Sequence, residues 1–329
     1  MTQKYDVAGL GNAIMDVIAA VDDQFLLTHG IAKGGMTLID EYRAGELHKQ
    51  LTGSVEAAGG SAANTMAGLA SLGGNALFIG KVCDDRLGKA FGESLKALGV
   101  TYANAPVAGG SPTASSVIVV TEDGQRSMNT YLGACREMTP DDVSVDDIMA
   151  AKILYIEGYL WDTDEAKDAA RKAIAAARKA GGKIALSLSD AFCVGRFRDE
   201  FLELMKGLDI LFANEDEAKA LFETDDFEAV ANKLSAWGGI AAVTRGASGC
   251  VVIHGGERHA VAAMPVAKVV DSTGAGDQFA AGFLFGLARE KKLDACGRLG
   301  VMAAAEIISH YGARPETSLK EMAGKIGLL

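Results

Sequence analysis

The sequence lacks the features of a membrane-spanning, secreted or nucleic-acid-binding protein. Its longest apolar run, 279–288, is interrupted by two glycines and falls far short of the roughly 18 residues that a membrane span requires. The chain reaches Asp6 without a cationic segment followed by an apolar block, so no secretory signal is expected. The net charge of −11 offers no basic surface for phosphate backbones. We therefore expect no membrane and no nucleic acid among its partners.

Cysteine and proline are also scarce. The five cysteines are widely separated and form no CxxC pair, which is typical of reduced thiols in a cytoplasmic protein. There are five prolines against 40 glycines and no Pro-rich or Ser/Gly-rich linker, so we expect one domain over residues 1–329 with many tight turns. The pattern of charges does not decide between a monomer and a homodimer.

Two common nucleotide-binding fingerprints are absent. The P-loop motif GxxxxGK[ST] does not occur. The motif GxGxxG does not occur either, which disfavours a nicotinamide-dependent dehydrogenase.

Strand and helix patterns alternate from residue 152 onward. The expected strands are 153–156, 183–188, 210–213, 240–244 and 249–254, and the expected helices are 165–180, 197–206, 215–222, 276–290 and 294–310. Such alternation builds a doubly wound α/β fold, in which helices cover both faces of a mostly parallel sheet.

The first half of the chain has a different pattern. One buried strand is expected at 5–11, and helices are expected at 61–72 and 86–98. Two alternating runs, 114–121 and 126–132, flank an Asp-Gly turn and predict a β-hairpin. A small β-element inserted into a doubly wound core suggests a lid over a site at the strand ends, and we expect segments of about 14–40 and 100–133 to form it.

The segment DSTGAGD, from Asp271 to Asp277, runs directly into an apolar helix. Gly274 and Gly276 place no side chain in the path of a ligand, and a helix start supplies unpaired N–H groups. Residues 274–277 therefore predict an anion hole at the positive end of a helix dipole. There Asp277 is expected to stay ionised with an ordinary pKa; the alternative is that it merely caps the helix.

This segment resembles the C-terminal signature of the phosphofructokinase-B/ribokinase family of ATP-dependent small-molecule kinases. Two other segments are similar to family motifs in the same order: GGSAAN at 59–64 resembles the N-terminal signature, and NEDE at 214–217 resembles the NxxE element. The resemblance implies a ribokinase-like fold and an enzyme that uses ATP and Mg²⁺ to phosphorylate an alcohol. A binding protein of this fold without activity is the alternative from another class, and the presence of Asp277 argues against it.

The resemblance also implies catalytic roles. Asp277 would take the proton of the acceptor hydroxyl. The N–H groups of Gly274, Ala275 and Gly276 would stabilise the charge on the transferred phosphoryl group.

Metal roles follow from the same resemblance. Asn214 and Glu217 would organise water around Mg²⁺, although on spacing alone a helix capping box is favoured. Asp271 and Thr273 would hold a monovalent cation such as K⁺.

ATP would lie against the turn TRGASG at 244–249. The implied contacts are Thr244, Gly246 and Gly249, with Arg245 as a cationic clamp and Asn214 alongside. Ser187 stands where relatives usually have Asn near the phosphates, and its hydroxyl has a shorter reach.

Polar residues after the first strand and at the Gly-Gly turn suit a vicinal diol. Asp16 can accept two hydroxyl hydrogen bonds, and Asn64 can both donate and accept. By resemblance, the remaining substrate-binding residues there are Asn12, Gly59, Gly60 and Ser61.

Other segments, notably 153–160 and 208–215, are more similar to adenosine kinases than to plain sugar kinases. Leu132 and Leu160 match positions that press on the purine, and Tyr159 and Trp161 are aromatic neighbours. Ordinary core packing is the alternative for these side chains. The sequence thus predicts phosphorylation of the 5′-hydroxyl of a ribonucleoside, adenosine first, with ribose, fructose or a related sugar as the alternative acceptor.

Overall fold

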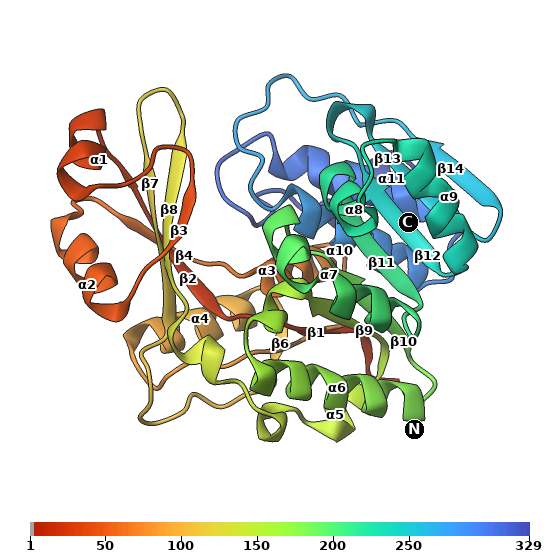
Figure 1. Cartoon of the computed structure of the whole chain (residues 1–329), viewed down its shortest axis with the longest axis horizontal. Helices are drawn as coiled ribbons and strands as arrows, with labels where there is room; N and C mark the ends of the chain where they lie inside the picture. The colour runs from red at the N-terminus through yellow and green to blue at the C-terminus, as the bar shows by residue number, and fades with distance from the viewer. Residues whose placement is uncertain (1–2) are drawn as a thin grey trace.

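The structure is a computed structural model that describes residues 3–329, and it contains a large sheet and a smaller one (Figure 1). The strands of the large sheet are β14 (Glu257–Val261), β13 (Cys250–His254), β12 (Ile240–Thr244), β11 (Ile210–Asn214), β10 (Lys183–Ser187), β9 (Ala151–Glu157), β1 (Tyr5–Leu10), β5 (Ala76–Ile79) and β6 (Thr101–Tyr102), in this spatial order. From β12 to β6 all neighbours pair in parallel, whereas β13 and β14 pair antiparallel. The expected mostly parallel sheet is confirmed.

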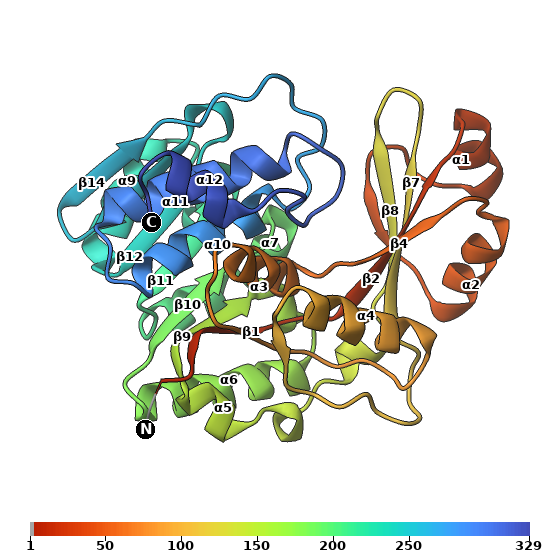
Figure 2. The same ribbon diagram turned by 180° about the vertical axis from the view of Figure 1, so that it is seen from behind.

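Helices cover both faces of this sheet (Figures 1 and 2). One face carries α5 (Val145–Met149), α6 (Asp164–Lys179), α7 (Ala191–Met205), α8 (Glu215–Phe222) and α9 (Phe227–Trp237); the other carries α3 (Ser61–Ser71), α4 (Arg86–Ala97), α10 (Ala275–Leu287), α11 (Leu293–Ile307) and α12 (Leu319–Lys325). Successive strand residues point to opposite faces, so Leu10 packs into one hydrophobic cluster and Val7 into the other. The doubly wound arrangement follows from this two-sided burial.

The smaller sheet stands to one side of the large one (Figures 1 and 2). Its order is β3 (Met36–Leu38), β8 (Arg126–Tyr131), β7 (Ala114–Val120), β2 (Ile14–Ala20) and β4 (Val55–Ala58). The helices α1 (Asp23–His29) and α2 (Glu41–Gln50) cover one face, where Leu26, Leu47, Val117 and Val119 form a small core. The other face borders the cleft described below.

The β7–β8 pairing confirms the expected hairpin, but the bounds of the smaller sheet differ from the expected 14–40 and 100–133. β4 lies beyond residue 40 and pairs with β2, while β6 pairs with β5 in the large sheet. Both strands are so short that long-range pairing, rather than their own sequence pattern, makes them strands.

The helix α7 begins six residues before the expected start at residue 197. Asp190 caps it by accepting a hydrogen bond from the Cys193 N–H at 2.6 Å. Phe197 has non-helical φ and ψ angles of −123° and 22°, so the expected start coincides with a kink inside the helix.

The apolar helix α10 packs against α11 with almost no side chain between the two backbones. A Cβ atom on Gly282 would lie 2.3 Å from the carbonyl oxygen of Leu299, and one on Gly300 would lie 2.7 Å from the Phe279 ring. Glycine at these positions permits the close approach. Among the helices within residues 3–329, none is long and apolar enough to cross a membrane.

We expect Gly282→Ala to lower the free energy of unfolding by about 1–3 kcal/mol, because its methyl group would meet a backbone carbonyl that cannot rotate away. Gly45→Ala in α2 is the matched control. Nothing lies within 4 Å of its Cβ position, so higher helix propensity should stabilise the protein by up to about 1 kcal/mol. Urea unfolding followed by circular dichroism measures both changes. Equal midpoints for Gly282→Ala and the parent protein would contradict the close helix contact.

Candidate active site

A cleft of about 990 Å³ lies between the smaller sheet and the ends of the parallel strands, where doubly wound folds bind their ligands. It brings together most of the residues that the sequence predicts for the site. These are Asn12, Asp16, Gly60, Ser61, Asn64, Leu132, Asn214, Glu217, Thr273, Gly274, Ala275, Gly276 and Asp277.

Asp277 lies in the first turn of α10 and faces the start of α3. Its carboxylate accepts hydrogen bonds from the Ser61 hydroxyl at 2.6 Å and from the Asn64 amide at 3.1 Å. Burial raises the pKa of Asp277, and these two hydrogen bonds oppose the rise. The ordinary pKa expected from the sequence is therefore wrong, because loss of surrounding water outweighs the favourable contacts. The carboxylate also makes no capping bond to its own helix.

The N–H groups expected to form the anion hole differ in availability. Gly274 is the N-cap of α10 and has a left-handed backbone with φ of 78°. The Ala275 N–H donates to the Ser272 carbonyl at 3.2 Å, so this group is already engaged. Within residues 3–329, the N–H groups of Gly274 and Gly276 have no acceptor and remain available to a ligand.

The Gly59-Gly60 turn brings the start of α3 against the strand that carries Asp16. A Cβ atom on Gly59 would lie 2.5 Å from a carboxylate oxygen of Asp16, and one on Gly60 would lie 2.2 Å from the Asn12 carbonyl oxygen. Gly60 also has φ of 89°. The turn thus requires glycine at both positions for the expected acceptor residues to lie together.

Asp16 is a candidate acceptor-binding group with an unusual charge environment. Burial raises the pKa of its carboxyl to about 7, and the charge of Asp277 adds to the rise. Arg126 and Arg314 act in the opposite direction.

Glu157, at the end of β9, is a site residue that the sequence analysis did not identify. It is fully buried, and its two oxygens accept hydrogen bonds from the backbone N–H groups of Asn12 (2.7 Å) and Ala62 (2.8 Å). It therefore ties the loop after β1 to the start of α3. Burial raises its pKa to about 8 although both N–H groups oppose this.

Asn214 and Glu217 form the capping box that their spacing predicts. The Glu217 N–H donates to the Asn214 side chain at 2.8 Å, and the Asn214 N–H donates to the Glu217 carboxylate at 3.0 Å. Both side chains also line the cleft. Burial raises the pKa of Glu217 to about 7, with Asp190 contributing.

One cleft thus joins a glycine-rich helix start, a half-buried carboxylate and a second glycine turn. Residues 10–320 match the model of the pfkB family of carbohydrate kinases. This chain belongs to the pfkB family. It is a phosphotransferase with an alcohol group as acceptor, and its membership of this kinase family implies ATP as the phosphoryl donor.

The chain is similar over its whole length to solved structures of pfkB-type kinases. The adenosine kinase of Sinorhizobium meliloti is 51% identical with a TM-score of 0.92, covering 98% of this chain and 99% of the other. A probable sugar kinase of Rhizobium etli is 48% identical with a TM-score of 0.93, covering all of both chains. Adenosine kinase 2 of Arabidopsis thaliana is 27% identical, covering 94% of this chain and 96% of the relative. The ribokinase-like fold expected from the sequence is confirmed.

The residues of this pfkB-family cleft fit Mg²⁺ held through water. Mg²⁺ keeps several waters and needs few carboxylates. Glu217 lines the cleft, but both of its oxygens already accept hydrogen bonds from Asn214. Within residues 3–329 no cluster of three or more metal-binding side chains occurs.

Asp271 does not fit the monovalent cation expected beside Thr273. One of its oxygens accepts hydrogen bonds from the N–H and hydroxyl of Thr273, at 3.0 and 2.7 Å. The other accepts from the Gly312 N–H at 3.1 Å and forms an ion pair with Arg126 of β8. A guanidinium from the smaller sheet thus already supplies positive charge to this carboxylate.

The residues expected around ATP mostly lie outside the cleft. The Arg245 guanidinium forms an ion pair with Glu215 at 2.7 Å. It also stacks on Phe227, with its central carbon 3.9 Å from the ring centroid, so its contacts are with α8 and α9. Thr244 pairs in register with Asn214, which connects the turn at 244–249, with Gly246 and Gly249, to the cleft. Ser187 makes a local contact, accepting from the Ser189 N–H at 3.3 Å.

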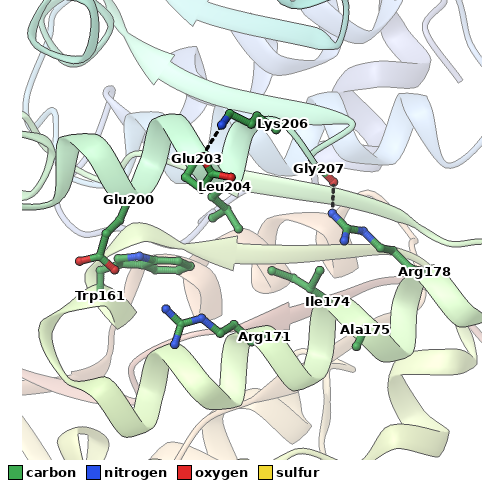
Figure 3. Close-up of a pocket in the computed structure, with 10 residues that line it drawn as sticks. All are labelled: Trp161, Arg171, Ile174, Ala175, Arg178, Glu200, Glu203, Leu204, Lys206 and Gly207. Atoms are coloured by element: carbon green, nitrogen blue, oxygen red, sulfur yellow. Dashed lines mark hydrogen bonds and ion pairs between the residues drawn. The ribbon is translucent and has the colours of Figure 1, made fainter.

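The aromatic and apolar residues expected beside a purine separate into two places. Tyr159 and Leu132 line the cleft, and Leu160 lies in a small hollow that adjoins it. Trp161 lies elsewhere: it packs on Phe201 and lines a separate hollow of about 560 Å³ between α6 and α7 (Figure 3). Its ordinary core role is therefore confirmed.

We expect Asp16→Asn to stabilise the protein at pH 8, because it removes a half-buried negative charge that accepts no hydrogen bond within residues 3–329. The pKa of Asp16 is about 7 in the folded protein, against the ordinary value of 3.8. Between these pH values the unfolded chain ionises first, so the parent protein loses stability as the pH rises. The variant's advantage in unfolding free energy should therefore grow from pH 4 to pH 7 and reach about 1–3 kcal/mol. Urea titrations at four pH values measure it. An advantage that does not change with pH would contradict burial of the ionised group.

Proposed function

We propose that this kinase transfers the γ-phosphoryl group of ATP to the 5′-hydroxyl of a ribonucleoside, with adenosine as the preferred acceptor. One observation carries the proposal: next to the residues expected to bind a diol, the cleft has an apolar wall built from side chains of the smaller sheet. The similarity to adenosine kinases of other organisms supports it.

This apolar wall is the inner face of the smaller sheet. Met36, Leu38, Ile118 and Met128 line the cleft there, and Met36 and Leu38 remain 47% and 50% exposed. Across the cleft Phe192, at the start of α7, is 67% exposed. Flat bases gain from such apolar and aromatic contacts, and methionine adapts well to a ring.

Polar residues beside this wall suit the ribose. Asp16 offers two acceptor oxygens, and the glycine turn at 59–60 leaves room for a ring against them. Leu132 and the adjoining Leu160 would close the site on the base side.

Asp277 would act as the general base. It takes the proton as the acceptor oxygen attacks the γ-phosphorus, and the bond from that phosphorus to the bridging oxygen breaks to release ADP. Ser61 and Asn64 hold the carboxylate in place. Its raised pKa brings it nearer to neutral pH, which favours general-base catalysis.

The start of α10 would stabilise the charge on the transferred group. The free N–H groups of Gly274 and Gly276 are the donors in this proposal, and Ala275 contributes only if its bond to Ser272 opens. Mg²⁺ would neutralise phosphate charge through water held by Asn214 and Glu217.

The sugar-kinase alternative rests on the same diol-binding residues, because Asp16 and Asn64 bind a ribose ring whether or not a base is attached. The similarity to a probable sugar kinase of Rhizobium etli supports free sugars as the alternative class of acceptor.

We expect Asp277→Asn to lower kcat by about 10²–10⁴-fold while ATP binding changes little, because the amide cannot accept the proton. Asp294→Asn is the matched control, since Asp294 lies in the first turn of α11 but faces solvent. Steady-state ADP release and calorimetric titration of ATP measure the two effects. Turnover of Asp277→Asn within threefold of the parent enzyme would exclude Asp277 as the base.

We expect ADP release with Mg-ATP to be fastest with adenosine in a panel that includes inosine, guanosine, ribose and fructose. Met128→Ser, which removes apolar wall from the cleft, should raise KM for adenosine about tenfold and leave KM for ribose within twofold. Activity confined to free sugars would overturn the nucleoside proposal. A purified, folded protein that is inactive with all five acceptors would contradict both acceptor classes.

A further inference from the structure

Arg314 lies in the segment between α11 and α12, behind the wall of the cleft that Asn64 forms. Its Nη1 donates to the Ser94 hydroxyl at 2.8 Å, and its Nε donates to the Asn64 side-chain carbonyl at 3.4 Å. Its Nη2 is shielded from solvent and has no hydrogen-bond partner within residues 3–329. Arg314 also takes part in no ion pair within these residues. A shielded guanidinium without a carboxylate partner is costly, so its position requires an explanation.

The backbone around Arg314 is firmly held. The Gln278 side chain donates to the Ala313 carbonyl at 3.0 Å and to the Asn64 carbonyl at 2.9 Å. On the other side, the buried Glu306 accepts from the N–H groups of Glu316 (3.0 Å) and Thr317 (2.9 Å). These contacts fix the chain on both sides of Arg314, so the guanidinium is placed rather than free to move.

The contact with Asn64 determines which way that amide faces. A guanidinium only donates hydrogen bonds, so the Asn64 oxygen must face Arg314. The Asn64 NH₂ group then faces Asp277, to which it donates. Arg314, Asn64 and Asp277 therefore form a chain in which each group donates to the next.

We infer that Arg314 is a positioning residue for phosphoryl transfer: it orients the Asn64 amide toward Asp277 and places a positive charge behind Asp16. The inference rests on the proposed function, because it assigns the two carboxylates to the base and to acceptor binding. Arg314 does not line the cleft, so its action passes through these side chains.

The charges around Asp16 make the second part of the inference measurable. Three charged side chains act electrostatically on Asp16: Arg126 from β8, Arg314 from the segment after α11, and Asp277 from α10. The two arginines lower the pKa of Asp16, whereas burial and Asp277 raise it. Burial lowers the pKa of Arg314 to about 10, which leaves it charged at neutral pH. Without Arg314, Asp16 would take up a proton at a higher pH and lose its capacity to accept two hydroxyl hydrogen bonds.

The test compares Arg314→Met, Arg314→Gln and Arg314→Lys in ADP-release assays with adenosine from pH 5.5 to 9. We expect the acidic limb of kcat/KM to move up by about one pH unit in the two neutral variants. KM for adenosine should rise about tenfold at pH 7 and recover toward the parent value at pH 9. Arg314→Lys keeps the charge and should restore the position of the acidic limb.

Arg171→Met is the control, because Arg171 lies on α6 (Figure 3), is 60% exposed and pairs only with Asp168 within residues 3–329. It should leave the pH profile unchanged. Urea unfolding at pH 7 identifies any variant that does not fold, and Arg314→Gln replaces Arg314→Met in that case.

The outcomes separate this inference from the proposed function. A uniform loss of activity at every pH that Arg314→Lys does not reverse shows a structural role and overturns the inference. A parent enzyme that is active on adenosine, with neutral variants that keep its pH profile, also overturns the inference alone. A parent enzyme inactive on nucleosides contradicts the proposed function first.

Discussion

The site depends on the hydrogen bonds that join Asp277 to the start of α3. Ser61 and Asp277 are 216 positions apart in the chain, yet their side chains meet at 2.6 Å. The contact requires α3 and α10 to pack closely, and Gly68 permits this because a Cβ atom there would lie 2.0 Å from the Gln278 side-chain oxygen. The relative position of these two helix starts sets the distance between the acceptor region and the free N–H groups of α10.

Burial raises the pKa of Asp16, Glu217 and Asp277, which line the cleft, and of Glu157, which lies behind Asn12. Because each of these groups ionises more readily in the unfolded chain, each reduces the stability of the folded protein as the pH rises toward neutrality. A ligand that brings cations or hydrogen-bond donors relieves this cost, which agrees with an enzyme that binds a metal–nucleotide and a polyhydroxy acceptor. Only Arg126 and Arg314 oppose the negative charge at Asp16 among the described residues.

Much of the fold could be predicted from the sequence because its elements carry strong local signals. The buried strands and the helix at 215–222 follow directly from apolar patterns and caps. The DSTGAGD segment predicted part of the cleft because glycine at a helix start is a local requirement, whereas GGSAAN was assigned only through its resemblance to a family motif. Short strands such as β4 and β6 could not be predicted, because only their partners make them strands.

Long-range contacts account for the site residues that the sequence did not reveal. A carboxylate at the end of a buried strand is a signal that could have identified Glu157, but its bonds to Asn12 and Ala62 depend on tertiary structure. Arg126 and Arg314 look like ordinary surface arginines in the sequence. Their neighbours, Asp271 and Asn64, come from distant segments. The contacts of Arg245 with Glu215 and Phe227 depend on tertiary structure in the same way.

The ion pair between Arg126 and Asp271 connects the hairpin of the smaller sheet to the segment that precedes α10. The same hairpin pairs through β7 with β2, the strand that carries Asp16. Any rigid swing of that sheet away from the body would break the ion pair and withdraw Asp16 in the same motion. The site would then open to a new acceptor in the same motion that frees the segment before α10, so neither change would occur without the other.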